Sequence, residues 1–163
     1  MLALAKNYPF ARALVNSGRL SLPATLHDSV LNTPDVDVFQ GRMVPGSAAL
    51  DAPVQLSGGD ASWLLGHLSA GFTLLVYAAE VDAAFEASDT SAECAIRQIA
   101  QASEGTSSLP DALIDRDGLI AKRYDMQPGT AYLLRPDQHV CARWRRVTPE
   151  KLQAALNRAL VKI

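Results

Sequence analysis

The sequence predicts an α/β domain in which a mixed β-sheet is flanked by helices, with an extended N-terminal arm. Three observations support this. Residues 72–78 (FTLLVYA) form a continuous β-branched and aromatic run, which is typical of a central strand buried on both faces. Residues 130–135 and 139–144 are two more strand-like runs joined by a short loop, as in an antiparallel hairpin. Thr148-Pro149-Glu150 then starts a helix, because Thr is a good N-cap and Pro fits the first helical position.

The composition is that of one folded domain. The chain has 163 residues, of which 48% are hydrophobic and 20% charged, with a net charge of -2. A chain of this length can bury a core without disulfides or a metal. Two cysteines are too few for a disulfide framework, and no secretory pattern opens the sequence, so we expect a cytoplasmic protein. The longest nearly apolar run, residues 72–79, is far shorter than the ~20 residues that span a membrane.

The regular pattern of the chain begins at Pro53. Residues 1–15 contain helix formers interrupted by Pro9, and from Asn16 to Pro53 several prolines punctuate a stretch with no helical or alternating period. A long stretch of this kind is usually a linker or a segment that lies on something else. We therefore predict an N-terminal helix and extended linker arm over residues 1–52, and a compact domain over residues 53–163.

The remaining elements of the compact domain follow from local patterns. Asp60 is expected to cap a short helix, and Asp117-Gly118 to turn the chain into another helix. The predicted elements are an edge strand at 54–56, helices at 61–70 and 91–103, a weak strand at 109–114 and a helix of about two turns at 119–124.

From residue 72 onward the predicted order is strand, helix, strand, helix, strand, strand, helix. This is the order of a thioredoxin-like domain, a mixed sheet covered on both sides by helices. A working thioredoxin has Cys-x-x-Cys after its first long strand, where a helix N-terminus lowers the pKa of one thiol. Here residues 78–82 read AAEVD, so the sequence excludes dithiol chemistry at that position.

Cys94 is the one candidate for thiol catalysis, and a weak one. Ser91-Ala-Glu-Cys94 has the spacing of a one-cysteine peroxidase motif at the start of a helix, but Glu93 would raise the pKa of the neighbouring thiol. An inert helix cysteine is the competing interpretation. Cys141 lies in a strand pattern and is interpreted as a small core residue. The three histidines have no ligand spacing, so no metal site is predicted, and His67 is expected to be partly buried and hydrogen-bonded.

Charge is unevenly distributed along the chain. Residues 1–23, 24–117 and 118–163 carry formal charges of +3, -11 and +6. The simplest interpretation is that acidic and basic parts face each other or solvate separate faces, rather than bind a polyanion. In the sequence RWRR, strand alternation places Arg143 and Arg145 on one solvated face and Trp144 on the buried face. No nucleic-acid partner is predicted.

Ordered motifs along nearly the whole chain carry a family resemblance. They are NSGRLS from Asn16, DSVLNTPD from Asp28, PG at 45–46 with DAPV from Asp51, FTLLV from Phe72, RY at 123–124, and PGTAYLLRPD from Pro128 with VCARW from Val140. Together they resemble the C-terminal region of FAD-dependent aromatic monooxygenases, in the group of phenol hydroxylase and 3-hydroxyphenylpropionate hydroxylase.

The resemblance implies an accessory, non-redox thioredoxin-like domain that follows the FAD and substrate domains and serves domain packing or dimerisation. The candidate contact residues are Asn16, Gly18, Arg19 and Leu20. FAD and NAD(P)H belong to the parent enzyme, whose flavin fingerprint and substrate pocket precede this region, so no cofactor or catalytic residue is assigned to this chain. Two alternatives remain: a free-standing peroxidase-like protein using Cys94, and a dimerising module whose arm exchanges between copies.

Overall fold

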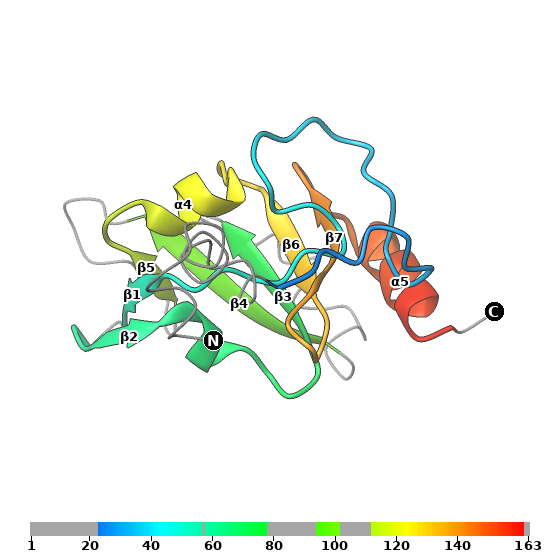
Figure 1. The fold of residues 1–163 in the computed structure, drawn as a ribbon. Coiled ribbons are helices and arrows are strands. Elements are labelled where there is room, and N and C mark those ends of the chain that lie inside the picture. Colours follow the sequence, from blue (N-terminus) through cyan, green and yellow to red (C-terminus); the bar gives the residue numbers. More distant parts are fainter. Residues whose placement is uncertain (1–22, 57, 78–93, 102–111, 162–163) are drawn as a thin grey trace, which may run out of the picture.

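The computed structural model describes residues 23–56, 58–77, 94–101 and 112–161 (Figure 1). The elements in chain order are β1 (Pro53–Gln55), β2 (Ala61–Trp63), the 3-10 helix η2 (Leu64–His67), β3 (Phe72–Tyr77), β4 (Cys94–Gln101), β5 (Leu113–Asp115), α4 (Leu119–Tyr124), β6 (Ala131–Leu134), β7 (Val140–Trp144) and α5 (Pro149–Ala159).

The described strands form one mixed seven-stranded sheet in the order β2-β1-β5-β4-β3-β6-β7. Strands β3, β4 and β5 run parallel, and the remaining pairs are antiparallel. All six residues of β3 are buried, with Leu74 paired to Ile96 on one side and to Leu133 on the other. The predicted central strand and the predicted hairpin of β6 and β7 are both confirmed.

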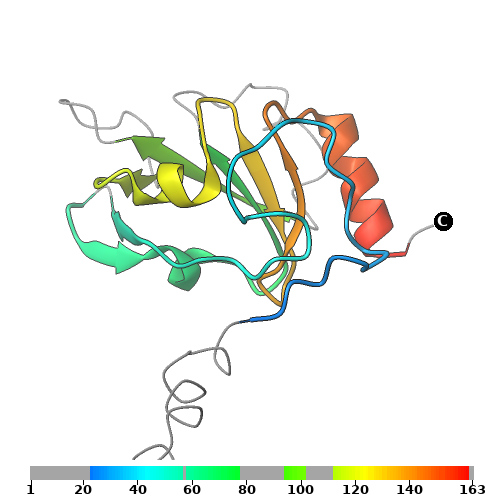
Figure 2. The same ribbon diagram turned by 45° about the horizontal axis from the view of Figure 1, so that its top comes forward.

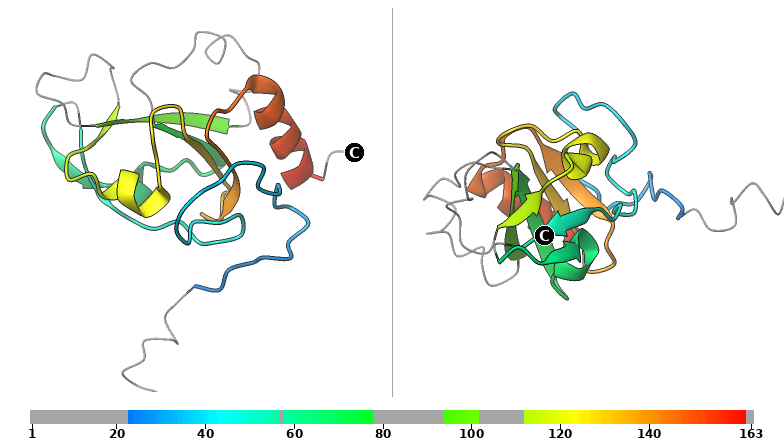
Figure 3. Two further views of the ribbon diagram at one scale, coloured as in Figure 1. Left: turned by 90° about the horizontal axis from the view of Figure 1, so that it is seen from above. Right: turned by 90° about the vertical axis from the view of Figure 1, so that its left-hand side faces the viewer.

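The sheet is covered on both faces (Figures 2 and 3). On one face, Leu152 and Leu156 of α5 pack against Leu133 and Trp144. On the other, Tyr124 of α4 joins a second apolar cluster that includes residues from β1, β3 and the arm. Because the strands are apolar on both sides, they require this two-sided cover. The α/β class, with a mixed sheet flanked by helices, is confirmed.

Both helices begin where local chemistry predicts. The side chain of Thr148 accepts a hydrogen bond from the Lys151 amide at 3.4 Å, and Pro149 opens α5. At α4, the carboxylate of Asp115 accepts from the amides of Ile120 and Ala121 at 3.2 and 2.9 Å. This buried carboxylate satisfies helix amides that would otherwise lack a partner.

The predicted helix at 91–103 is wrong, since Cys94–Gln101 is strand β4; the remaining residues of that prediction lie outside the described ones. Ile96 packs in the cluster beneath α5, whereas Ile99 packs in the cluster on the opposite face. In a strand that is apolar on both faces, two isoleucines three residues apart imitate the spacing of a helical stripe.

The predicted helix at 61–70 is also wrong. Residues 61–63 form β2, the outer neighbour of β1, and only Leu64–His67 makes a single 3-10 turn. Asp60 does not cap that turn; its carbonyl accepts a hydrogen bond from Leu56 at 2.8 Å. Strand β1 exists as predicted, but it is second from the edge of the sheet, because β2 lies outside it.

The described part of the arm, residues 23–52, lies on the domain of the same chain (Figures 1 and 2). Its backbone bonds to β7: the amide of Thr33 donates to Cys141 at 2.9 Å, and the amide of Gly46 donates to Val140 at 2.7 Å. Val140 in turn donates to Ser47 at 2.8 Å. The arm therefore occupies the side of β7 that faces away from β6.

Candidate functional site

Cys94 is the first residue of β4 and sits in the apolar core under α5, paired in register with Phe72. Burial raises the pKa of its thiol to about 12. A catalytic thiolate needs the opposite environment, a partly exposed position with a lowered pKa. The position also differs from the predicted one, because Cys94 opens a strand and not a helix.

Cys141 is fully buried in β7, as the core interpretation predicted. Burial raises the pKa of its thiol to about 11. Its sulfur donates a weak hydrogen bond to the carbonyl of Leu31 in the arm at 3.4 Å. Both cysteines are free thiols, and both are set in apolar surroundings that keep them protonated.

Arg143 and Arg145 form the most elaborate polar cluster on the sheet. Arg143 binds the carboxylate of Asp35 through Nη2 and Nε, at 2.6 and 3.0 Å, and donates from Nη1 to the carbonyl of Met43 at 2.8 Å. Arg145 pairs with the carboxylate of Asp125 and donates to the carbonyl of Val38. We call Asp35, Phe39, Asp125, Arg143 and Arg145 the arginine clamp.

Phe39 lies at the centre of the arginine clamp. The guanidinium carbons of Arg143 and Arg145 stand 4.4 and 4.0 Å from the centroid of its ring, in cation-π geometry. Its edge meets Tyr132 of β6, with ring centroids 5.8 Å apart. The arm is thus held to the sheet by charge and by an aromatic ring together, and the clamp uses both guanidiniums for contacts within the chain.

The solvated face predicted for Arg143 is wrong. Its exposed fraction is 6%, because the arm covers this part of β7. The predicted alternation is confirmed, since Trp144 is buried in the opposite core. Of the two interpretations of the uneven charge, the pairing of Arg143 with Asp35 favours the one in which acidic and basic parts face each other.

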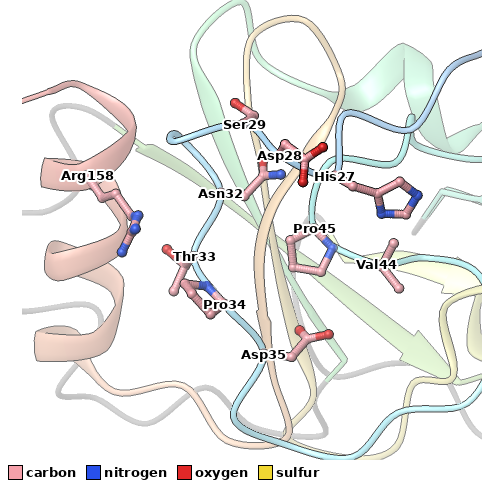
Figure 4. A pocket seen from close by; sticks show the side chains of 10 residues that line it. All are labelled: His27, Asp28, Ser29, Asn32, Thr33, Pro34, Asp35, Val44, Pro45 and Arg158. Atoms are coloured by element: carbon pink, nitrogen blue, oxygen red, sulfur yellow. The ribbon is translucent and has the colours of Figure 1, made fainter.

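A pocket of about 410 Å³ opens between the arm and α5 (Figure 4). Arg158 lines it from α5, and the other lining residues come from the arm. Asn32 is 8% exposed, and its Oδ1 has no hydrogen-bond partner, nor has Oγ1 of Thr33. No sequence pattern pointed to this pocket, because Arg158 is far from the arm in the sequence. The lining residues are His27, Asp28, Ser29, Asn32, Thr33, Pro34, Asp35, Val44, Pro45 and Arg158.

The three histidines lie in different parts of the structure. His27 lines the pocket, His139 lies beside Asp137, and His67 is half-buried with its Nε2 2.8 Å from Oγ of Ser62. In the ranges that the structure describes, no three His, Cys, Asp or Glu side chains are grouped to hold a metal. Nor does any helix in those ranges have the length and apolarity to cross a membrane. Residues 16–20, with the candidate contacts Asn16, Gly18, Arg19 and Leu20, lie outside the described part.

No protein-family model and no curated protein matches this sequence. Solved structures do match its fold. The flavin-dependent monooxygenase PieE, bound to FAD and substrate, is 22% identical with a TM-score of 0.69, and the match covers 91% of this chain and 27% of PieE. Aklavinone-11 hydroxylase, bound to FAD and aklavinone, is 21% identical with a TM-score of 0.60, covering 82% of this chain and 26% of the hydroxylase.

The thioredoxin domain of a thiol-disulfide oxidoreductase from Bacteroides vulgatus also matches, at 11% identity and a TM-score of 0.53. That match covers 71% of this chain and 97% of the thioredoxin domain. The fold is therefore thioredoxin-like. The chain spans about a quarter of the length of the two monooxygenases and nearly all of the single thioredoxin domain.

Proposed function

We propose that this chain is an accessory, non-redox C-terminal domain of a FAD-dependent aromatic-ring monooxygenase, and that it serves the packing of that enzyme's domains. In this proposal residues 1–52 are the arm and residues 53–163 the thioredoxin-like domain. FAD and NAD(P)H are used by the parent enzyme, and the partners of this domain are the FAD and substrate domains. The sequence motifs quoted above and the fold likeness point in the same direction.

The extent of the fold likeness carries the proposal. The match to PieE leaves 9% of this chain unmatched. This is far fewer residues than the arm contains, so the match includes much of the arm. The match to the single thioredoxin domain leaves 29% of this chain unmatched. That unmatched share is large enough to contain nearly all of the arm. An arm shared with flavin monooxygenases supports a domain built for the same setting.

The thiols support a non-redox role over the peroxidase-like alternative. The thioredoxin-like fold by itself is compatible with both functions, because function depends on the site and not on the fold. Cys94 and Cys141 are both buried with raised pKa values, and neither stands at a helix start. Thiolate chemistry requires the reverse.

The pocket between the arm and α5 does not fit a flavin dinucleotide. A pyrophosphate is held by several amide groups or cations, whereas here the carboxylates of Asp28 and Asp35 line the same space as the single guanidinium of Arg158. Asn32 and Thr33 add an amide oxygen and a hydroxyl group, and no cation. This accords with a flavin bound by other domains of the parent enzyme.

The proposal is tested on the native polypeptide. An antibody raised against this chain is used to isolate the protein that carries it from its native cells, and the mass and flavin content of that protein are measured. We expect a polypeptide a little over three times as long as this chain, because 91% of this chain corresponds to 27% of PieE, with about one flavin per polypeptide. A 17.4 kDa species without flavin would overturn the proposal.

A further inference from the structure

The arm presents the three most exposed large apolar side chains of the described residues. Val30, Val36 and Val38 are 78%, 75% and 81% exposed. We call these three residues the valine ridge. Single exposed apolar residues are ordinary on protein surfaces, but three in nine consecutive positions are a concentration along the sequence that the core of the domain does not use.

Two of the three ridge residues, Val36 and Val38, arise from an inverted pattern. Asp35 binds Arg143, and Asp37 accepts a hydrogen bond from the amide of Arg145 at 2.9 Å, so both carboxylates point toward the sheet. The valines between and after them are left on the outer side. A segment whose outer side met only water would expose its charges and bury its valines. This segment is therefore built to be covered on its outer side.

The ridge is held in place before any partner arrives. Phe39 lies between two guanidiniums next to Val38, and the amide of Gln40 donates to the carboxylate of Asp125 at 2.8 Å. The carbonyl of Val30 accepts a hydrogen bond from Arg158 of α5 at 3.1 Å. A surface fixed in this way loses little conformational entropy on binding.

The pocket beside Val30 adds a polar part to this surface. Arg158, which binds the carbonyl of Val30, also lines the pocket, and there Oδ1 of Asn32 and Oγ1 of Thr33 lack partners (Figure 4). Buried polar atoms without partners are rare in folded proteins, and these two lie at the pocket that adjoins Val30. The complementary surface therefore has apolar side chains opposite the valines and polar groups opposite the pocket, which Asp28 and Arg158 line.

We propose that the valine ridge and the adjoining pocket dock against the flavin-binding portion of the same monooxygenase. This inference rests on the proposed function. The arm belongs to the fold shared with PieE, in which this fold makes up 27% of the chain, so the larger part of such an enzyme is available as the covering surface. Figure 2 shows the first described residues running from beneath the sheet to the end of α5, where Arg158 binds the carbonyl of Val30.

The test places a photo-crosslinking benzophenone residue at position 36 or 38 of the whole flavoprotein. The control position is Lys122, which is exposed on α4. We expect illumination to link positions 36 and 38, but not 122, to peptides of the flavin-binding portion. Links to a second copy of this domain, or links no more frequent than those from position 122, would overturn the docking proposal.

A paired set of variants gives an independent readout. V36D/V38D puts two charges into the proposed contact, whereas V36T/V38T keeps the shape and adds no charge. Burying each valine is worth about one order of magnitude in affinity, so we expect the Asp variant to be cleaved between the domains at least tenfold faster in limited proteolysis, and the Thr variant less so. Equal cleavage of all three proteins would contradict the proposal.

The two proposals fail in different ways. If no flavoprotein carries this chain, the proposed function fails and the ridge loses the partner named for it. If the flavoprotein exists but the crosslinks and proteolysis are negative, the docking surface alone is wrong. The Asp variant of this chain by itself is expected to unfold at the same temperature as the original, because both side chains are exposed.

Discussion

Asp35 and Arg143 are 108 residues apart in the sequence and form a two-pronged ion pair, with N to O distances of 2.6 and 3.0 Å. The Arg143 side chain is 5% exposed and that of Asp35 is 30% exposed. Such a pair is costly to break from one side, because the remaining charge stays buried without compensation. The pair thus couples the position of the arm to the stability of the sheet.

Removing the charge of Asp35 tests this coupling. We expect Asp35→Asn to lower the free energy of unfolding by about 2 kcal/mol, because Arg143 then lacks its counter-ion. The control is Asp28→Asn, at an exposed aspartate of the arm that forms no ion pair with another described residue. Urea denaturation followed by tryptophan fluorescence measures both. Equal midpoints for the two variants would show that the ion pair does not hold the arm.

Asp125 makes part of the stability depend on pH. Burial opposes its ionisation, but the hydrogen bonds from the Gln40 amide and Arg145 lower its pKa below the ordinary 3.8. A carboxyl group whose pKa is lower in the folded state stabilises the fold above its unfolded pKa, and this contribution is lost as the pH falls through the folded value. We expect Asp125→Asn to flatten the decline in stability below about pH 4. The measurement is the urea midpoint of both proteins from pH 6 downward. If the midpoint falls with pH as steeply in Asp125→Asn as in the original protein, the prediction is wrong.

The two thiols are expected to be unreactive in the folded protein. With pKa values of about 12 for Cys94 and 11 for Cys141, both are protonated at pH 8 as well as buried. A thiol reagent such as DTNB should therefore label them only at the rate of unfolding, and Cys94→Ser should leave no rapidly reacting thiol behind. Labelling in urea supplies the total count. Fast labelling of one thiol in the native state would favour the peroxidase-like alternative.

Gly46 is expected to be harder to replace than Gly41, the other glycine in the described part of the arm. Its φ is +92°, and an added Cβ would overlap the carbonyl group of Leu26. Gly41 has a similar φ of +86° with no atom near an added Cβ. Gly41→Ala should thus cost about 1 kcal/mol from backbone strain, and Gly46→Ala about 3 kcal/mol because overlap is added. Urea denaturation of both variants separates the two effects, and equal losses would rule out the overlap.

The elements found from the sequence are those with strong local signals. Residues 72–77 are a continuous apolar run. A turn precedes the helix at 119–124, and Thr148 caps the last helix. None of these signals depends on the rest of the chain. Strand β4 was missed because its apolar residues face two different cores. This segment is a strand because it pairs with β3 and β5, and that pairing depends on tertiary structure and not on the local sequence.

The candidate surfaces were harder to predict than the fold. The uneven charge along the chain left open whether acidic and basic parts meet or solvate separate faces, and it did not identify Asp35 and Arg143 as a pair. The inward direction of Asp35 and Asp37, and with it the outward direction of Val36 and Val38, depends on contacts with β7 more than a hundred residues away. The pocket unites the arm with Arg158 in the same way.

The backbone bonds between the arm and β7 have a consequence for solubility. An outer strand with free amide and carbonyl groups is a template on which other chains assemble. On β7, these groups are the amide of Val140 and the carbonyls of Val140 and Cys141. They are hydrogen-bonded to Ser47, Gly46 and Thr33 of the arm. A fragment trimmed to begin at Pro53 would keep the apolar core yet bare this edge, and we expect it to associate edge to edge. On this expectation the arm protects the edge of the sheet from association, in addition to offering a candidate contact surface.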